Sequence, residues 1–204
     1  ATQTNVLGSR NVIDSAISHG VSKVVCLSTD KAVYPVNALG ITKALMEKVV
    51  ESSARNLGEG NTVLTIVRYG NVLFSRGSVI PLFMKQIKEK KAISVTEPDM
   101  TRFLLPLKEA TGLVTFALEQ GRQGDVFVRK APSCSVGDLA QAVKNIFRSD
   151  SEIKIIGMRH GEKLYETLAS KGELLRSEDM GDYLRVSIDD RDLNYNKYLN
   201  EGDI

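Results

Sequence analysis

The stretch Val24–Lys43, VVCLSTDKAVYPVNALGITK, decides the fold of this chain. It opens with an apolar, β-branched run bounded by polar residues, which is typical of a buried strand in a parallel sheet. The run stops at Ser28, Thr29, Asp30 and Lys31, so hydroxyls, a carboxylate and an ammonium directly follow the strand. Ligands of open α/β sheets bind at this carboxyl edge. We therefore predict a site there, the alternative being a surface turn with an Asx cap.

Neighbouring segments complete a βαβ unit around this strand. Asn37–Leu57 has helical spacing and is closed by Gly58 and Gly60, and Thr62–Val67 is a second β-branched strand. Strand, helix and strand in this order form a right-handed crossover between parallel strands. Upstream, Thr4–His19 places its apolar residues on one helical face. The sequence thus predicts an α/β fold with a parallel sheet and helices on its faces.

After Val67 the pattern loosens, and RYGNVLFSRGSVIP indicates a loop along a site. We expect residues 1–70 to form the sheet with the catalytic strand. Residues 71–204 form the mainly substrate-facing part, with 125–147 returning to the sheet. The further helices expected are Val79–Lys90, Lys108–Gln120, Ser135–Phe147 and a short one at Leu164–Ala169, and the further strands are Ile93–Val95, Asp125–Arg129 and Glu152–Ile156.

The 204 residues carry a net charge of +2, with two histidines and two cysteines. This balance predicts neither nucleic-acid nor membrane binding, and no apolar run approaches the roughly 20 residues that span a bilayer. The basic run Lys85–Lys91 is most simply a solvated helix end. Cys26 and Cys134 are too few for a disulfide framework and indicate reduced thiols of a cytoplasmic protein. With His19 and His160 they show no metal-ligand spacing, so no metal site is predicted.

Three reactive side chains make the first candidate site. Thr29, Asp30 and Lys31 follow the strand, and Lys43 lies on the next helix. A lysine near a cofactor and a second cation loses its proton readily, which makes it a usable base, and Asp30 beside it could act as an acid. The sequence contains neither a G-x-S-x-G elbow nor a P-loop, which argues against hydrolase and NTPase functions.

Arginine-bearing loops make a second candidate site. The guanidinium group offers a planar fork for phosphate oxygens, and nearby glycines let backbone amides approach an anion. Three such loops suit a diphosphate better than a neutral ligand, although a polar loop with scattered arginines is the alternative. Their members are Arg68, Asn71, Ser75, Arg76 and Ser78, then Thr101 and Arg102, and then the charged turn Arg159–Lys163.

Several segments carry a family resemblance. They are TNVLGSRNVIDSAISHGVSKVVCLSTDKAVYPVNALGITKA, RYGNVLFSRGSVIPLF, DMTRF and RHGEKLYETL. With them the chain resembles the UDP-N-acetylglucosamine 4,6-dehydratases of bacterial polysaccharide biosynthesis, an extended short-chain dehydrogenase/reductase group. RHGEKLYETL and RDLNY look most like the branch that also inverts C5, used for capsule and O-antigen sugars. The resemblance runs from about Thr2 to Asp203.

This resemblance implies a fold and a reaction. The fold would be the C-terminal part of a Rossmann-like NAD(P)-binding domain with a smaller substrate-binding α/β subdomain, in a cytoplasmic homo-oligomer. The implied enzyme is a lyase that uses NADP, with NAD as the alternative. Hydride leaves C4 of the UDP-sugar, water is eliminated across C5 and C6, and hydride returns to C6. Reprotonation of C5 from the opposite face gives a UDP-2-acetamido-2,6-dideoxy-L-arabino-hexos-4-ulose.

The resemblance also implies roles for individual residues. Lys31 would remove the C5 proton, Asp30 would assist departure of the C6 hydroxyl, and Thr29 would hydrogen-bond the sugar. Lys43 would hold the nicotinamide ribose. The implied cofactor-binding residues are Ser28, Lys43, Tyr69 and Val72, and those implied to face the substrate are Asn71, Ser75, Arg76, Arg102, Arg159 and Glu162.

Two departures from the family pattern keep alternatives open. Leu39 stands where the family's Tyr-x-x-x-Lys motif has its tyrosine, so the base for the C4 hydroxyl is open among Asp30, Lys31 and a water relay, with Tyr34 as a poorer candidate. The glycine-rich turn that seats the pyrophosphate is absent from this sequence, which indicates truncation at the amino end. Alternatives are a retaining dehydratase or UDP-sugar 4-epimerase of the same superfamily. A further alternative is a non-catalytic fragment that binds a sugar nucleotide or partner chain.

Overall fold

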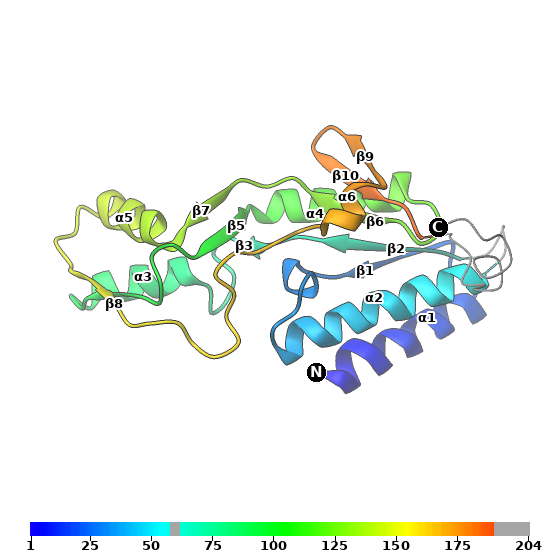
Figure 1. Ribbon diagram of the computed structural model, residues 1–204, viewed down its shortest axis with the longest axis horizontal. Coiled ribbons are helices and arrows are strands. Elements are labelled where there is room, and N and C mark those ends of the chain that lie inside the picture. The colour runs from blue at the N-terminus through cyan, green and yellow to red at the C-terminus, as the bar shows by residue number, and fades with distance from the viewer. Residues whose placement is uncertain (58–61, 190–204) are drawn as a thin grey trace, which may run out of the picture.

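The main sheet has five strands in the order β1-β2-β6-β10-β9 (Figure 1). The computed structural model describes residues 1–57 and 62–189. β1 pairs with β2 and β2 with β6 in parallel, which confirms the α/β class with a Rossmann-like parallel sheet. The antiparallel hairpin β9–β10, which extends the sheet beyond β6, was not predicted. The strands are β1 Lys23–Leu27, β2 Val63–Arg68, β6 Val126–Arg129, β9 Ser177–Met180 and β10 Tyr183–Val186.

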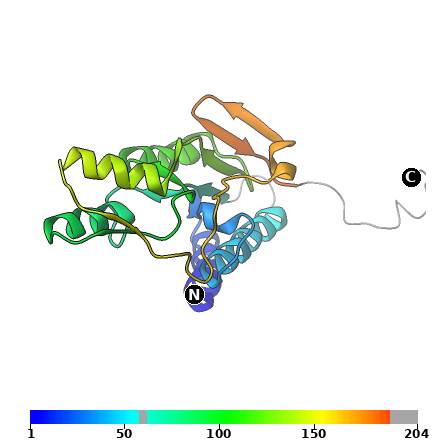
Figure 2. The same cartoon turned by 60° about the vertical axis from the view of Figure 1, so that its left-hand side comes forward.

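Helices cover both faces of this sheet (Figure 2). The π-helical turn η1 (Gln3–Gly8) leads into α1 (Ser9–Ser18), and α1 and α2 (Ala38–Asn56) lie on one face, with α4 (Leu107–Gln120) on the other. Alternate residues of a strand point to opposite faces. Leu64 and Ile66 of β2 accordingly pack in the core cluster with α1 and α2, whereas Val67 packs in the cluster with α4.

Strand β1 is less buried than its apolar sequence predicted. Its first four residues are half-buried, and Leu27 is 46% exposed. Among the described residues β1 has a hydrogen-bonded neighbour, β2, on one side only, so it is an edge strand. The apolar run of β1 is explained by the helices that cover its two faces. Its outer edge has no neighbouring strand among the described residues.

A second lobe lies at the left of Figure 1, with α3 and α5 packed against each other. Its core contains Phe83, Ile93 and Met100, each at most 1% exposed. Within segment 125–147 only β6 pairs with the main sheet, whereas β7 and α5 belong to this lobe. The lobe comprises α3 Val79–Lys88, α5 Val136–Ile146, the parallel pair β4 Ile93–Val95 and β8 Ile153–Ile155, and the three-stranded sheet of β3 Asn71–Val72, β5 Thr101–Leu105 and β7 Ser133–Ser135.

The helix expected at Leu164–Ala169 is wrong. This segment runs without regular structure beside β5, where the Leu164 carbonyl accepts a hydrogen bond from the backbone N–H of Thr101 at 2.9 Å. A short helix, α6 (Lys171–Leu174), begins only afterwards, opened by a capping box of Ser170 and Glu173.

Three other expectations concern surfaces and chain ends. The basic run 85–91 ends α3, and its lysines are exposed, as a solvated helix end requires. In the described ranges, no helix combines the length and apolarity needed to cross a membrane. Gly58, Gly60 and the RDLNY segment lie outside the described residues.

Candidate active site

The predicted catalytic residues form a tight turn at the end of β1. Thr29 is extended and caps the 3-10 turn η2 (Asp30–Ala32), its hydroxyl oxygen accepting the N–H of Lys31 at 3.4 Å. The same hydroxyl donates to Oδ1 of Asp30 at 2.8 Å. Asp30 is completely buried. The turn therefore stands at the carboxyl end of β1, where the sequence places it, and its carboxylate is buried rather than exposed as in a surface Asx turn.

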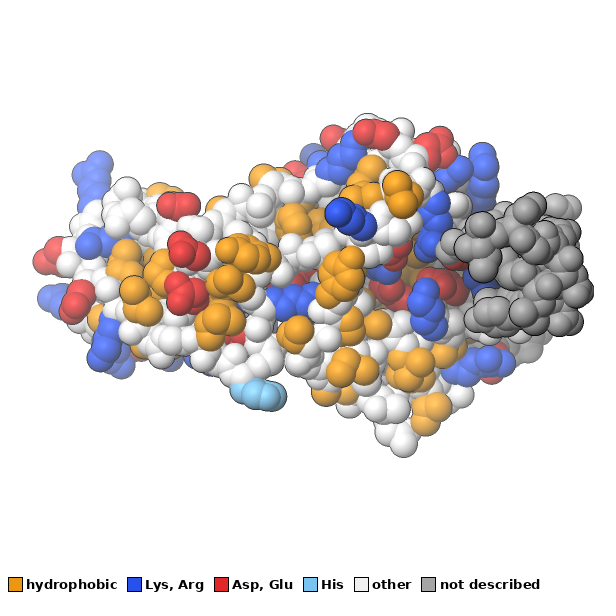
Figure 3. All heavy atoms as spheres, in the orientation of Figure 1, with side chains coloured by type: hydrophobic (Ala, Val, Ile, Leu, Met, Phe, Trp, Pro, Cys, Tyr) orange, Lys and Arg blue, Asp and Glu red, His pale blue; other side chains and the backbone are white. Residues whose placement is uncertain are grey.

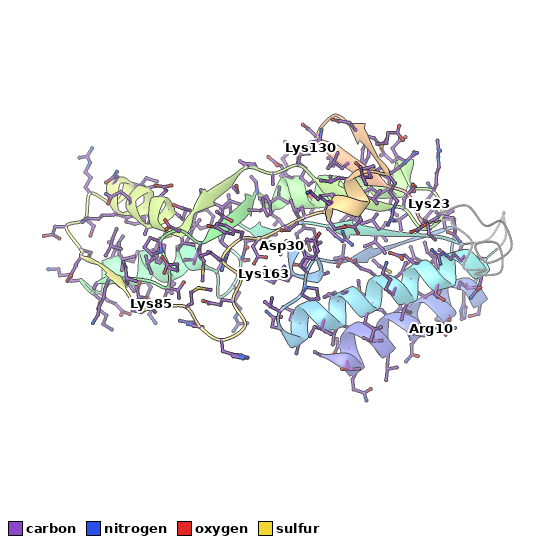
Figure 4. The ribbon with its side chains drawn as sticks, viewed as in Figure 1. Arg10, Lys23, Asp30, Lys85, Lys130 and Lys163 are labelled. Carbon is purple, nitrogen blue, oxygen red and sulfur yellow. The ribbon has the colours of Figure 1, made fainter. Side chains whose placement is uncertain are left out.

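Two lysines and a second carboxylate join Asp30. Lys31 Nζ lies 3.0 Å from Asp30 Oδ1 and 3.9 Å from Glu166 Oε1. Lys163 Nζ lies 3.7 Å from Glu166 Oε2 and donates a hydrogen bond to the Val33 carbonyl. We call Asp30, Lys31, Lys163 and Glu166 the acid–base cluster. It lies at the centre of the molecule, where Figure 4 labels Asp30 and Lys163.

The acid–base cluster leaves hydrogen-bonding capacity open. Asp30 Oδ2 and Glu166 Oε2 are buried, and neither has a hydrogen-bond partner among the described residues. Burial and the nearby charge of Asp30 raise the pKa of Glu166, against the smaller effects of Lys31, Arg102 and Lys163. One carboxyl that holds a proton more readily beside a second carboxylate is suited to acid–base chemistry.

Two glycines allow the chain to close around this turn. A Cβ on Gly40 would lie 2.2 Å from the Lys31 carbonyl oxygen, so the start of α2 can pack onto η2 only without a side chain. A Cβ on Gly70 would lie 2.5 Å from Phe103 Cβ and 3.2 Å from Asp30 Oδ2. Asn37 caps α2 and also donates to the Gly161 carbonyl at 2.9 Å, tying the helix to the loop that carries Lys163.

Lys43 faces a separate groove along the open edge of β1. Its Nζ donates to the Leu27 carbonyl at 2.9 Å, and burial lowers its pKa although Cys26 and Glu47 act in the opposite sense. η1, α1, β1 and α2 enclose about 430 Å³ here. Ser28 lies one residue beyond β1, and its buried hydroxyl has no partner among the described residues. Lys43 in the groove and the unpaired Ser28 hydroxyl just beyond β1 are polar groups that could contact a bound ligand.

The other expected cofactor residues lie apart from this groove. Tyr69 is half-buried and packs in the core cluster under α4, and Val72 lines a second pocket in the other lobe. Leu39, in the first turn of α2, is 49% exposed and offers no proton. The edge groove therefore brings together Lys43 and the end of β1, but not Tyr69 or Val72.

The second pocket has a volume of about 210 Å³ and unites four of the six expected substrate residues. Asn71, Arg102, Arg159 and Glu162 line it, whereas Ser75 and Arg76 are exposed on the adjoining turn and do not. The lobe's surface near the waist of the molecule carries a group of apolar side chains (Figure 3). Apolar side chains, such as Ile80 and Met100, also line the pocket, so it is a mixed polar and apolar site.

Polar groups inside this pocket are only partly satisfied. Asn71 Oδ1 and Ser78 Oγ are buried and have no hydrogen-bond partner within the described chain. Arg102 donates to the carbonyls of Thr101 at 2.7 Å and Lys163 at 3.1 Å. Its guanidinium therefore also fixes the segment that carries Lys163 and Glu166.

Arg68, which the sequence suggested for phosphate binding, does not face an anion site. Its guanidinium donates to both oxygens of Glu47, at 2.8 and 2.6 Å, and to Glu173 Oε1 at 2.8 Å. We call these three residues the buried ion network. Their hydrogen bonds raise the pKa of Arg68 further and lower that of Glu173 to about 2. The Arg68 guanidinium therefore has a structural role.

Sequence reasoning missed Glu166, and it grouped Lys163 with the anion-binding loops rather than with Asp30 and Lys31. Both belong to RHGEKLYETL, and their spacing of three residues lets one ion pair form between them. Glu166 is only 4% exposed, which is uncommon for a glutamate unless it is paired. In the described part of the chain, no group of three or more His, Cys, Asp or Glu side chains could hold a metal ion.

A family model described as "Polysaccharide biosynthesis protein" matches residues 1–188. The chain belongs to this family. Among curated relatives, the UDP-glucose 4-epimerases of Rickettsia felis and Rickettsia canadensis are 54% and 55% identical to this chain over 203 residues. The matches cover 100% of this chain and 60% of each relative, so the chain spans about three fifths of their length.

Solved structures agree with the fold. Pen from Bacillus thuringiensis is 38% identical with a TM-score of 0.85, over 90% of this chain and 58% of that one. A dTDP-glucose 4,6-dehydratase from Streptomyces venezuelae, with NAD and TYD bound, has 20% identity and a TM-score of 0.74, covering 84% and 58%. The UDP-glucose 4-epimerase of Thermotoga maritima, with UDP-glucose, has 22% identity and a TM-score of 0.72, covering 84% and 62%. The last two likenesses concern the fold alone.

Proposed function

We propose that the chain carries the catalytic end of a nicotinamide-dependent enzyme that oxidises C4 of a UDP-hexose. The observation that carries the proposal is the acid–base cluster at the carboxyl end of β1, with Lys43 near the same strand end. The names of the relatives support the substrate class, because the curated Rickettsia relatives are named UDP-glucose 4-epimerase.

The cofactor, NADP or NAD, would supply hydride acceptance and return. Lys43 and the unpaired Ser28 hydroxyl would hold its ribose side. Asn71, Arg102 and Arg159 would hold the sugar nucleotide in the second pocket. Lys31 and Asp30 would then move protons at the sugar, since Asp30 has one oxygen available and Lys31 is partly exposed, at 29%.

Epimerisation at C4 is the fate of the 4-keto sugar that the relatives' names support. It needs one proton acceptor for the C4 hydroxyl and a ketone that can be reduced from either face. Leu39 offers no proton at the start of α2, so Lys31 or Asp30 would serve as that acceptor. This reaction leaves C5 and C6 of the sugar untouched.

Dehydration with C5 inversion is a second candidate, and the composition of the cluster favours it. Elimination needs a base for the C5 proton and an acid for the departing C6 hydroxyl. Lys31 and Asp30 are 3.0 Å apart and could supply both, with Glu166 as a further carboxyl whose pKa is raised. An epimerase needs fewer acid–base groups than this. The product would be the 6-deoxy-4-keto sugar of the L series.

Product analysis separates these candidates. The natural full-length protein is incubated in D2O with UDP-glucose and with UDP-N-acetylglucosamine, and the products are identified by NMR. Epimerisation predicts the C4 epimer with no deuterium at C5, whereas dehydration predicts loss of one water and deuterium at C5. Retention at C5 would overturn the inverting form of the second candidate. Turnover of neither substrate would overturn the proposed function.

A further inference from the structure

Glu166 belongs to the acid–base cluster, but the reaction proposed above gives it no defined step. It comes from the irregular segment between β8 and α6, far along the chain from Asp30 and Lys31. Its side chain is 4% exposed, yet its buried Oε2 has no hydrogen-bond partner among the described residues. Burying a carboxylate oxygen without a hydrogen-bond partner costs folding free energy, so its presence indicates a role other than stability.

Two lysines hold Glu166 from opposite sides. Lys31 Nζ is 3.9 Å from Oε1, and Lys163 Nζ is 3.7 Å from Oε2. Lys163 is itself fixed by its hydrogen bond to the carbonyl of Val33, the residue that directly follows η2. Glu166 is therefore placed relative to the turn that carries Lys31, although the two residues lie 135 positions apart in the sequence.

Lys31 needs such a second anchor. Asp30 is its neighbour in sequence, so their contact alone leaves the long lysine side chain free to turn toward solvent. A second carboxylate opposite the ammonium limits that freedom, because both contacts can be kept only in a narrow range of orientations. The charged groups that face Glu166 are Asp30 and Lys31 from η2, Lys163 from its own segment and Arg102 from β5.

We propose that Glu166 is a positioning residue that holds the Lys31 ammonium beside Asp30 in the reactive orientation. The inference rests on the proposed function, since it assigns Lys31 a task at the substrate. Only the ionised form of Glu166 can hold the ammonium in this way. Protonation of Glu166 therefore releases Lys31 and lowers turnover.

The test compares Glu166→Gln, which keeps the shape of the side chain, with the natural protein across pH. At neutral pH kcat should fall by about 10- to 100-fold with little change in KM, as misplacement of a reactive group predicts. The kcat ratio of natural protein to variant should shrink toward one as pH falls through the raised pKa of Glu166. Glu166→Asp should restore the pH dependence and part of the activity.

Glu89→Gln is the matched control. Glu89 also lies between two lysines, 3.9 Å from Lys85 Nζ and 2.7 Å from Lys91 Nζ, but on the exposed end of α3. Its kcat should equal that of the natural protein at every pH. A constant kcat ratio for Glu166→Gln across pH would mean a merely structural role and would overturn the proposal.

A second measurement does not depend on turnover, and it still tests the proposal if Glu166→Gln does not fold. The carboxyl group of Glu166 is titrated by carbon-13 NMR in the natural protein and in Lys31→Met. Because the charge of Lys31 lowers the pKa of Glu166, the variant should titrate at higher pH. An unmoved titration would overturn the contact between the two residues. Failure to turn over any UDP-sugar would instead overturn the proposed function.

Discussion

Two charged networks tie the chain after β8 to the sheet domain, and they are built differently. The buried ion network joins β2 to α2 and α6, and the acid–base cluster joins η2 to the segment between β8 and α6. In the buried ion network Arg68 reaches both carboxylates at 2.6–2.8 Å. In the acid–base cluster the separations between lysine and carboxylate are 3.0, 3.7 and 3.9 Å. Asp30 and Glu166 each keep one oxygen without a hydrogen bond among the described residues.

This difference separates a structural role from a chemical one. A buried charge whose hydrogen bonds are complete has nothing left to offer a substrate, and removing one partner leaves an uncompensated charge. A buried carboxylate with an open oxygen is poorly stabilised by the protein alone, which is typical of functional sites. The two networks should therefore respond in opposite ways to mutation.

The largest effect should follow Asp30→Asn. The substitution keeps the shape of a fully buried side chain but removes the charge that faces Lys31. Turnover of the UDP-sugar should fall by about 100- to 10,000-fold, the usual contribution of a general acid or base. Steady-state kinetics measures this, with circular dichroism to verify folding. A variant that keeps a tenth or more of the natural kcat would remove Asp30 from the chemistry.

Arg68→Met should act on stability instead. It leaves Glu47 and Glu173 buried without their partner, at side-chain exposures of 3% and 14%. The free energy of unfolding should fall by about 3–5 kcal/mol in urea denaturation. Adding Glu47→Gln should recover part of the loss because it removes one unpaired charge. If Arg68→Met abolished turnover without loss of stability, the contrast between the networks would fail.

Acid should weaken the buried ion network through Glu173. Its pKa is about 2 in the folded protein against 4.5 for an unperturbed glutamate. A depressed folded pKa contributes stability above the unfolded value, and this is lost as pH falls from about 4.5 to 2. The contribution is of the order of 3 kcal/mol. In denaturation at several pH values, the stability gap between natural protein and Glu173→Gln should close over that range, and a constant gap would contradict the prediction.

An exposed pair gives the smallest effect and a baseline. Arg10 Nε lies 2.7 Å from Asp14 Oδ2 on α1, with both side chains at least half exposed; Figure 4 labels Arg10. Asp14→Asn should change the free energy of unfolding by no more than about 0.5 kcal/mol. A loss as large as that of Arg68→Met would show that short ion-pair distance, rather than burial, determines stability here.

Much of the fold follows from local patterns in the sequence. The continuous β-branched run of β2 indicates a strand covered on both faces, and the helical spacing of α1 and α2 indicates side chains that pack against one adjacent layer. The hairpin β9–β10 was missed because its segment SEDMGDYLRV is mostly polar, with Val186 alone fully buried. The helix expected at 164–169 failed because contacts with β5 override its helical propensity.

The site was predictable only where its residues are adjacent in sequence. Thr29, Asp30 and Lys31 directly follow one strand, so the sequence alone predicts that they lie together at the sheet edge. Lys163 and Glu166 come from a distant loop, and only the fold brings Glu166 to 3.9 Å from Lys31 and brings Lys163 to the Val33 carbonyl. Arg68 shows the converse error, because a guanidinium suited to phosphate is equally suited to two buried carboxylates.

The most direct test of the contrast is Lys31→Met in the natural full-length protein, with kcat and unfolding free energy measured on one preparation. We predict loss of turnover by at least about 100-fold. The loss of stability should be smaller than that of Arg68→Met, because Glu166 can take up a proton when the lysine charge is gone. Retained turnover, or a loss that only follows the unfolded fraction, would contradict the assignment of the acid–base cluster to catalysis.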